Sequence, residues 1–82
     1  MKKIAIVTGA TGGIGKEFTR LLVKEEVNEV WAVARNEKKL AQLKEEYGDK
    51  VVIIPKDLTD TKELCDLEAR IRKEDARVSY LI

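Results

Sequence analysis

Four short apolar runs alternate along the chain with three longer segments whose hydrophobic residues recur at helical spacing. The runs are KIAIV at 3–7, EVWAVA at 29–34, VVIIP at 51–55 and VSYLI at 78–82. Their nearly continuous apolar character is typical of strands that are buried on both faces, as in a parallel sheet covered by helices. The alternation predicts an α/β fold in which a helix connects each strand to the next.

Each of the three intervening segments has one apolar face, which we expect to pack against the sheet as core. Asn36 is placed to cap the second helix, which Gly48 or Asp49 then ends. Asp60 followed by Glu63 has the spacing of a capping box and predicts the start of the third helix. The apolar faces comprise Ile14, Phe18, Leu21 and Leu22 in the first segment, Leu40, Leu43 and Tyr47 in the second, and Leu64, Leu67 and Ile71 in the third.

Strands and helices in this order predict one continuous sheet. Right-handed crossovers between neighbouring parallel strands make a β-α-β-α-β-α-β chain the first part of a doubly wound sheet, for which we expect the strand order 3-2-1-4. The expected fold class is therefore α/β, a partial Rossmann-like doubly wound parallel sheet. The chain has 82 residues with no linker, repeat or low-complexity tract, so we expect a single domain.

Charge and composition exclude several classes of protein. Sixteen Lys and Arg residues against fifteen Asp and Glu residues give a net charge of +1, too little to attract nucleic acid or an anionic membrane surface. No apolar run approaches the roughly 20 residues that span a bilayer, and the apolar start stops at Thr8, too early for a signal peptide. With one cysteine, Cys65, and no histidine, we expect no disulfide, no metal site and a reducing cytoplasm.

The stretch TGATGGIGKE, Thr8 to Glu17, fits two phosphate-binding loops. A P-loop would begin at Ala10 and use Lys16 on the phosphates, but it needs Ser or Thr next to hold magnesium, and that residue is Glu17. A dinucleotide-binding turn needs only glycines that let the backbone approach a pyrophosphate at the start of a helix. The second interpretation is favoured.

Further residues support the dinucleotide interpretation. Thr11 can add a hydroxyl donor to the loop, and the helix that begins near Gly13 presents free N–H groups to a pyrophosphate. The second strand ends at Ala34 and Arg35, about 20 residues beyond the loop, where this architecture places the side chain that contacts the ribose.

The chain resembles the short-chain dehydrogenases and reductases along its whole length. TGATGGIG fits that family's TGxxxGxG loop, VARNEKKL resembles the end of its second strand and the start of its second helix, and DLTD resembles its turn after the third strand. The resemblance implies that Gly9, Gly13, Ile14 and Gly15 hold the pyrophosphate, and that the Asp57 carboxylate and the Leu58 backbone face the adenine. It also implies reversible hydride transfer between a nicotinamide cofactor and an alcohol or carbonyl.

The glycine loop alone leaves the branch of the family open. Gly9, Gly12 and Gly15 also satisfy the TGxxGxxG pattern of the extended, often epimerase-like branch. We favour the shorter oxidoreductase branch for two reasons. The segment ARNEKKL is similar to the corresponding segment in its members, and Gly13 stands where the extended loop often has an aromatic residue.

Arg35 predicts the choice of cofactor. An acidic side chain at the end of the second strand would accept hydrogen bonds from both ribose hydroxyls and favour NAD, and Ala34 lacks such a group. Arg35, with Asn36 beside it, offers a positive charge and hydrogen-bond donors to a 2′-phosphate. We therefore expect NADP rather than NAD as the cofactor.

No catalytic residue is expected within the chain. Members of the family continue with an Asn-Ala-Gly loop, a catalytic serine and a Tyr-x-x-x-Lys pair. Here Val51 stands four residues after Tyr47, and only two residues follow Tyr80. Residues 1–82 are therefore expected to be the N-terminal part of one NAD(P)-binding Rossmann domain that lacks the C-terminal catalytic half and is inactive alone. The alternative is a small non-catalytic protein that binds a nucleotide or only a partner.

Self-association is also expected from the predicted sheet. Right-handed crossovers place two helices on one face and one helix on the other, and one helix about 10 Å wide cannot cover four strands. The run VSYLI would form an apolar edge strand with unpaired backbone groups. We expect a homo-oligomer formed through the bare face or this edge, unless a C-terminal half covers both.

Overall fold

The computed structural model describes residues 1–82 and contains the expected four strands and three helices in alternating order. All four strands are parallel, and their order in the sheet is β3-β2-β1-β4, which confirms the predicted topology. The elements are β1 (Lys2–Thr8), α1 (Gly13–Leu22), β2 (Glu29–Ala34), α2 (Glu37–Tyr47), β3 (Val51–Pro55), α3 (Thr61–Lys73) and β4 (Ala76–Leu81).

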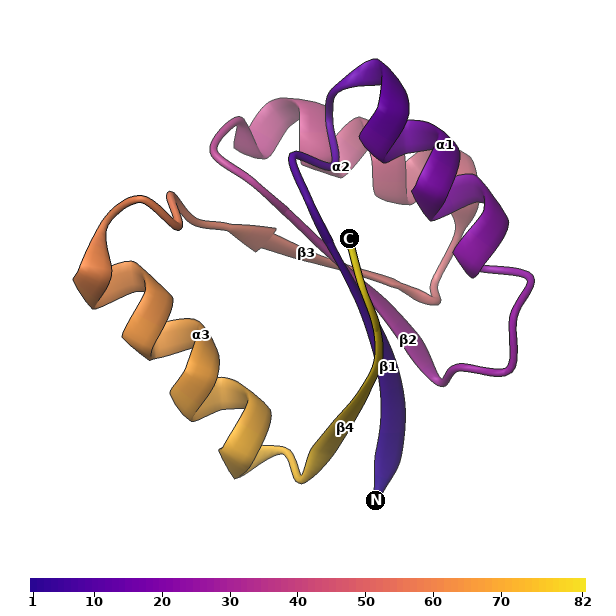
Figure 1. Ribbon diagram of the computed structural model, residues 1–82. Coiled ribbons are helices and arrows are strands. Elements are labelled where there is room, and N and C mark those ends of the chain that lie inside the picture. The colour runs from indigo at the N-terminus through magenta and orange to yellow at the C-terminus, as the bar shows by residue number, and fades with distance from the viewer.

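The sheet lies between two unequal helical layers. Helices α1 and α2 lie together on one face, and α3 lies alone on the other (Figure 1). Alternate residues of β1 and β2 therefore enter two separate cores, because successive side chains of a strand point to opposite faces. The core under α1 and α2 includes Ala5 and Val7, and the core under α3 includes Ile4, Ile6 and Trp31.

The predicted helix boundaries are confirmed by their hydrogen bonds. Asn36 caps α2 through its Oδ1, which accepts the N–H of Lys39 at 3.0 Å. Asp60 caps α3 in the same way and accepts from the N–H groups of Lys62 and Glu63. Gly48 rather than Asp49 ends α2, with a φ of +94° that glycine adopts readily.

The predicted apolar face of α1 is partly wrong. Ile14 is 77% exposed and Leu21 is 49% exposed, whereas Thr19 is fully buried and its hydroxyl donates to the Gly15 carbonyl at 3.0 Å. The reason lies at Gly15, where a Cβ atom would come within 2.2 Å of the Gly9 carbonyl oxygen. This close approach turns Gly15 and Thr19 toward the sheet, so Ile14, one residue away on the helix, points outward.

The apolar faces predicted for α2 and α3 are buried to different extents. Leu40 and Leu43 of α2 are buried, as predicted. On α3 only Leu67 is buried, while Leu64 is 45% exposed because this helix lies alone on its side of the sheet. None of the three helices combines the length and the hydrophobicity needed to cross a membrane.

The edge strand β4 contains an irregularity that the sequence does not predict. Ile4 of β1 pairs with Val78, but the next residue, Ala5, pairs with Tyr80, so one residue of β4 is extra. The shift puts Val78 and Leu81 on the α3 side of the sheet and Tyr80 on the α1 side. All three remain substantially exposed.

Candidate functional site

The carboxyl ends of β1, β2 and β3 bring three distant segments of the chain together. They are the loop between β1 and α1, the end of β2 and the turn after β3. Open α/β sheets bind ligands at this end of their strands. The segments border an open cavity of about 240 Å³, which is lined by Thr8, Gly9, Thr11, Val33, Ala34, Arg35, Lys56, Asp57 and Leu58.

The structure thus brings together five of the site residues that the sequence predicts, Gly9, Thr11, Arg35, Asp57 and Leu58. The other predicted residues lie beside this cavity but do not line it. They are Gly12, Gly13, Ile14 and Gly15 at the start of α1, and Asn36, which follows β2.

The loop between β1 and α1 has a shape that requires glycine. Gly9 has a φ of +61°, a conformation that residues with a side chain rarely adopt. The Gly12 N–H donates to the Gly9 carbonyl at 3.1 Å, and the Ala10 N–H donates to the Val33 carbonyl at 3.1 Å, which ties the loop to β2. The loop is therefore held in one position against the sheet.

The first turn of α1 presents free backbone donors. The Lys16 N–H makes the first bond of the helix, to the Gly12 carbonyl at 2.9 Å, so the N–H groups of Gly13, Ile14 and Gly15 lack a helical acceptor. Gly12 has no side chain that could cap them. A Cβ on Gly13 would meet nothing within 4 Å, so the space beside Gly13 is open. Such a turn can bind an anionic group.

Asp57 is held as a carboxylate by its own turn. The Thr59 hydroxyl donates to Asp57 Oδ1 at 2.6 Å, and the Thr59 N–H donates to the same oxygen at 3.0 Å. These bonds, with a smaller effect from the nearby Arg35 charge, hold the pKa of Asp57 below its ordinary value. The second carboxylate oxygen of Asp57 makes no hydrogen bond and can accept one from a ligand.

Arg35 and Asn36 differ in how many of their side-chain groups are free to bind a ligand. Arg35 is exposed, lines the cavity and forms no ion pair. Asn36 uses its Oδ1 to cap α2, which leaves its amide N–H₂ group as a donor. The guanidinium is therefore the main free charge at the end of β2.

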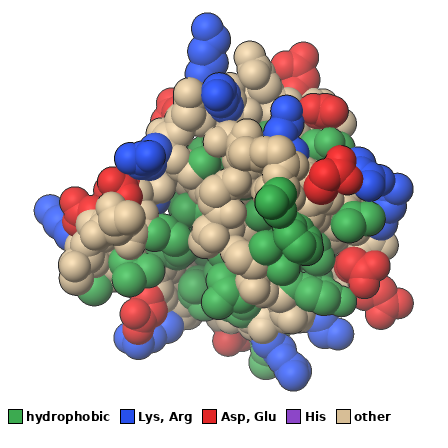
Figure 2. Space-filling model, turned by 45° about the horizontal axis from the view of Figure 1, so that its top comes forward, with side chains coloured by type: hydrophobic (Ala, Val, Ile, Leu, Met, Phe, Trp, Pro, Cys, Tyr) green, Lys and Arg blue, Asp and Glu red, His purple; other side chains and the backbone are tan.

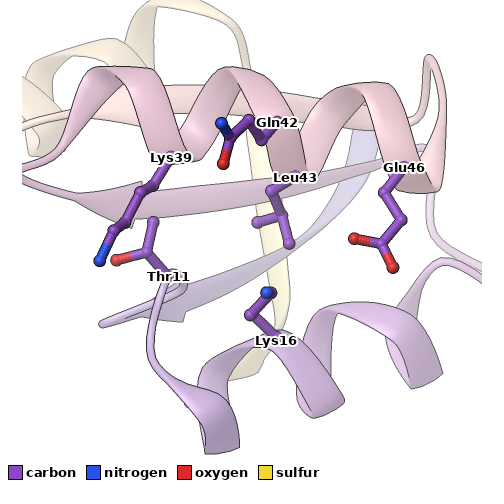
Figure 3. A pocket seen from close by; sticks show the side chains of 6 residues that line it. All are labelled: Thr11, Lys16, Lys39, Gln42, Leu43 and Glu46. Atoms are coloured by element: carbon purple, nitrogen blue, oxygen red, sulfur yellow. The ribbon is translucent and has the colours of Figure 1, made fainter.

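A second cavity of about 190 Å³ lies between α1 and α2, and Thr11 lines both cavities (Figure 3). Sequence reasoning missed Lys39 and considered Lys16 only for the rejected P-loop, and it also missed Lys56 in the first cavity. Lys56 was detectable as the residue directly before Asp57, but no motif marks Lys16 or Lys39 as neighbours of one cavity. The second cavity is lined by Thr11, Lys16, Lys39, Gln42, Leu43 and Glu46.

Comparison with known proteins identifies the family of the chain. A family model described as short chain dehydrogenase matches residues 3–82. An uncharacterized oxidoreductase of Saccharomyces cerevisiae, YIR035C, is 34% identical over 100% of this chain and 33% of its own length. The NADP-dependent 3-hydroxy acid dehydrogenase YdfG of Escherichia coli is 30% identical over 96% of this chain and 32% of its own length.

A solved structure agrees with these sequence relationships. A short-chain dehydrogenase from Streptomyces avermitilis superimposes with a TM-score of 0.82 and 28% identity, over 99% of this chain and 30% of that one. The chain spans about a third of the length of the curated relatives that it matches. By its glycine loop, its strand order and these matches, the chain belongs to the short-chain dehydrogenase family.

Proposed function

We propose that residues 1–82 form the NADP(H)-binding portion of an oxidoreductase that transfers hydride between a nicotinamide cofactor and an alcohol or carbonyl. The observation that carries the proposal is Arg35, an unpaired cation at the end of β2 in the same cavity as the glycine loop and Asp57. When bound, the nicotinamide ring supplies or accepts the hydride. The relative YdfG, described as NADP-dependent, supports the choice of cofactor.

The first turn of α1 fits the pyrophosphate. The free N–H groups of Gly13, Ile14 and Gly15 would donate to its oxygens, and the positive end of the helix dipole would stabilise its charge. The absence of side chains at Gly12 and Gly13 lets the phosphates approach the backbone. Ile14 contributes only its backbone, because its side chain points into solvent.

The cavity beside the loop fits the adenosine half of the cofactor. Leu58 offers apolar surface and a backbone group to the adenine, and the free oxygen of Asp57 can accept from the exocyclic amine. Thr11, Arg35 and the Asn36 amide would surround a phosphate on the ribose 2′ position. Lys56, which pairs with Asp66 at 3.8 Å, also lines this cavity.

Calorimetry with two adenosine fragments tests the proposal. The natural gene product that contains residues 1–82 is titrated with adenosine 2′,5′-bisphosphate and with 5′-AMP, before and after Arg35→Ala. A charge-assisted hydrogen bond of roughly 1.5 to 3 kcal/mol predicts about 10-fold to 100-fold preference for the bisphosphate, which the variant should lose. Arg77→Ala, which removes another exposed, unpaired arginine on β4, is the control. Equal affinities in the unmutated protein would refute NADP specificity.

Catalysis is assigned to residues outside 1–82. No Tyr-x-x-x-Lys pair occurs in the chain, so we expect a polypeptide of these residues alone to show no turnover of nicotinamide cofactor. The check is cofactor absorbance with a panel of alcohols and carbonyls. Cofactor-dependent turnover by the purified 82-residue polypeptide would contradict this part of the proposal.

A further inference from the structure

The cavity between α1 and α2 has an excess of positive charge. Neither Lys16 nor Lys39 forms an ion pair, and Glu46 is the only acidic residue among the lining side chains. Thr11 and Gln42 add polar groups, and Leu43 is the one hydrophobic residue. A polar, net positive cavity of this kind suits an anionic group rather than an apolar ligand.

This cavity adjoins the proposed adenosine cavity through one side chain. Thr11 lines both, with Arg35 lining one cavity and Lys39 the other. Lys39 reaches from α2 toward the loop that carries Thr11 (Figure 3). The Asn36 cap fixes the start of α2, because its Oδ1 binds the Lys39 N–H at 3.0 Å. The backbone of Lys39 is therefore held at a constant position relative to the end of β2.

The position of Lys39 is unfavourable for the isolated helix. It stands in the first turn of α2, where the positive end of the helix dipole disfavours a cation. Lys38 stands in the same turn and carries the same charge, but it lines neither cavity. The two lysines thus have the same unfavourable interaction with the helix dipole, but only the Lys39 side chain lines a cavity. Lys38 is therefore the natural control.

We propose that Lys39 is a specificity-determining residue that contacts the cofactor 2′-phosphate from the side of Thr11 opposite Arg35. The inference rests on the proposed function and adds a second cation, contributed by α2, to the one at the end of β2. A lysine ammonium suits this role because it can approach a phosphate as a point charge without a fixed geometry. Arg35 and Lys39 together neutralise the dianionic phosphate from two sides.

The test uses the same titrations of the natural gene product with adenosine 2′,5′-bisphosphate and 5′-AMP. Lys39→Ala is expected to weaken binding of the bisphosphate roughly 5-fold and to leave 5′-AMP binding unchanged, since only the former carries the 2′-phosphate. Lys39→Arg should retain the preference. Lys38→Ala, which removes the same charge from the same helical turn, should change neither affinity. Higher salt should reduce the effect of Lys39→Ala, because an exposed ion pair is screened.

The outcomes separate this inference from the proposal on which it rests. Suppose that Arg35→Ala abolishes the preference for the bisphosphate and that Lys39→Ala leaves it intact. This result would refute the role of Lys39 but would leave NADP specificity standing. Equal weakening of both ligands by Lys39→Ala, or equal effects of Lys38→Ala and Lys39→Ala, would also refute the role of Lys39. The absence of any preference in the unmutated protein would refute NADP specificity and this inference together.

Discussion

At the residue scale, two glycines in one turn of α1 have opposite steric surroundings. A Cβ on Gly15 would lie 2.2 Å from the Gly9 carbonyl oxygen and 2.8 Å from the Ala10 Cα. These are backbone atoms of a loop that a hydrogen bond from Ala10 ties to β2, so they cannot move aside easily. A Cβ on Gly13 would meet nothing within 4 Å. Gly15 is therefore required by packing, whereas Gly13 leaves room that the fold itself does not use.

Alanine substitutions separate these two roles. We expect Gly15→Ala to lower the free energy of unfolding by about 1 to 3 kcal/mol through overpacking. Gly13→Ala should be neutral or stabilise the helix by up to about 1 kcal/mol, while weakening NADP binding if the pyrophosphate occupies the space above it. Urea unfolding and calorimetry of the natural gene product measure the two effects. Unchanged stability of the Gly15→Ala variant would contradict the packing argument.

The hydrogen bonds from Thr59 to Asp57 predict a pH effect. Thr59→Val removes the hydroxyl donor and should raise the pKa of Asp57 toward its ordinary value. Because the folded-state pKa is lowered, the bonds stabilise the fold above the unfolded-state pKa, and this contribution is lost as the pH falls through the folded-state value. Carboxyl carbon NMR titration measures the pKa directly. Thr61→Val is the control, since the Thr61 hydroxyl makes no hydrogen bond, and equal shifts in both variants would contradict the assignment.

At the scale of elements, α3 is fastened to the sheet by a polar cluster at its C-terminal end. Lys2 of β1 pairs with Glu29 at 2.9 Å and with Glu74, which directly follows α3. Arg70 pairs with Glu74 at 2.6 Å, and its guanidinium lies 4.9 Å from the ring centre of the buried Trp31. The cluster thus links β1 and β2 to α3, a helix that buries only one of its own side chains, Leu67.

The cluster predicts a loss of stability in acid. The hydrogen bond from Lys2, followed by that from Arg70, holds the pKa of Glu74 below its ordinary value. These hydrogen bonds stabilise the fold above the unfolded-state pKa of Glu74, and the stabilisation is lost as the pH falls through the lower folded-state pKa. Glu74→Gln should therefore lower Tm at neutral pH and converge with the unmutated protein in acid.

Thermal unfolding monitored by circular dichroism across pH measures this difference. Glu68→Gln is the matched control, because Glu68 pairs with Arg72 within α3 and forms no ion pair with the sheet. Equal effects of the two variants on Tm, or a constant difference at every pH, would contradict a role for Glu74 in fastening α3.

At the scale of the whole molecule, β4 has apolar grooves on both sides. Ile6, Leu64, Leu67, Ile71, Val78 and Leu81 line a groove of about 310 Å³ beside α3. Phe18, Leu21, Leu22, Tyr80 and Ile82 line another of about 330 Å³ beside α1. Hydrophobic side chains also gather in the middle of one face of the space-filling view, with charged side chains around them (Figure 2). Exposed apolar surface next to an edge strand favours association.

These grooves predict that a polypeptide of residues 1–82 alone self-associates. Each apolar side chain left in water forfeits roughly 1.5 to 3 kcal/mol of burial, against a total stability of about 5 to 15 kcal/mol for an ordinary domain. Sedimentation at several concentrations should show a mass that rises with concentration. Leu81→Lys, which places a charge at the edge and in the α3-side groove, should reduce association. A concentration-independent 9.3 kDa monomer with a cooperative thermal transition would contradict the prediction.

The sequence by itself determined the features that depend on neighbouring residues. The alternation of apolar runs and helical segments predicted the parallel sheet, and the doubly wound arrangement expected for such a chain predicted its strand order. Asn36 and Asp60 marked helix starts correctly, and the pair Gly48 and Asp49 marked the end of α2, since a cap is made with backbone groups only a few residues away. The glycine loop likewise placed the candidate site at the carboxyl ends of the strands.

Only the tertiary structure decided the features that depend on contacts between distant segments. The orientation of α1, which exposes Ile14 and buries Thr19, follows from how closely the helix approaches the Gly9 loop at Gly15. The irregular pairing of β4 arises against β1, at the opposite end of the sequence. Lys39 comes next to Thr11 because α1 and α2 pack on the same face of the sheet. Periodicity and capping signals report on a few neighbouring residues, and none of them specifies how far two packed elements rotate or shift against each other.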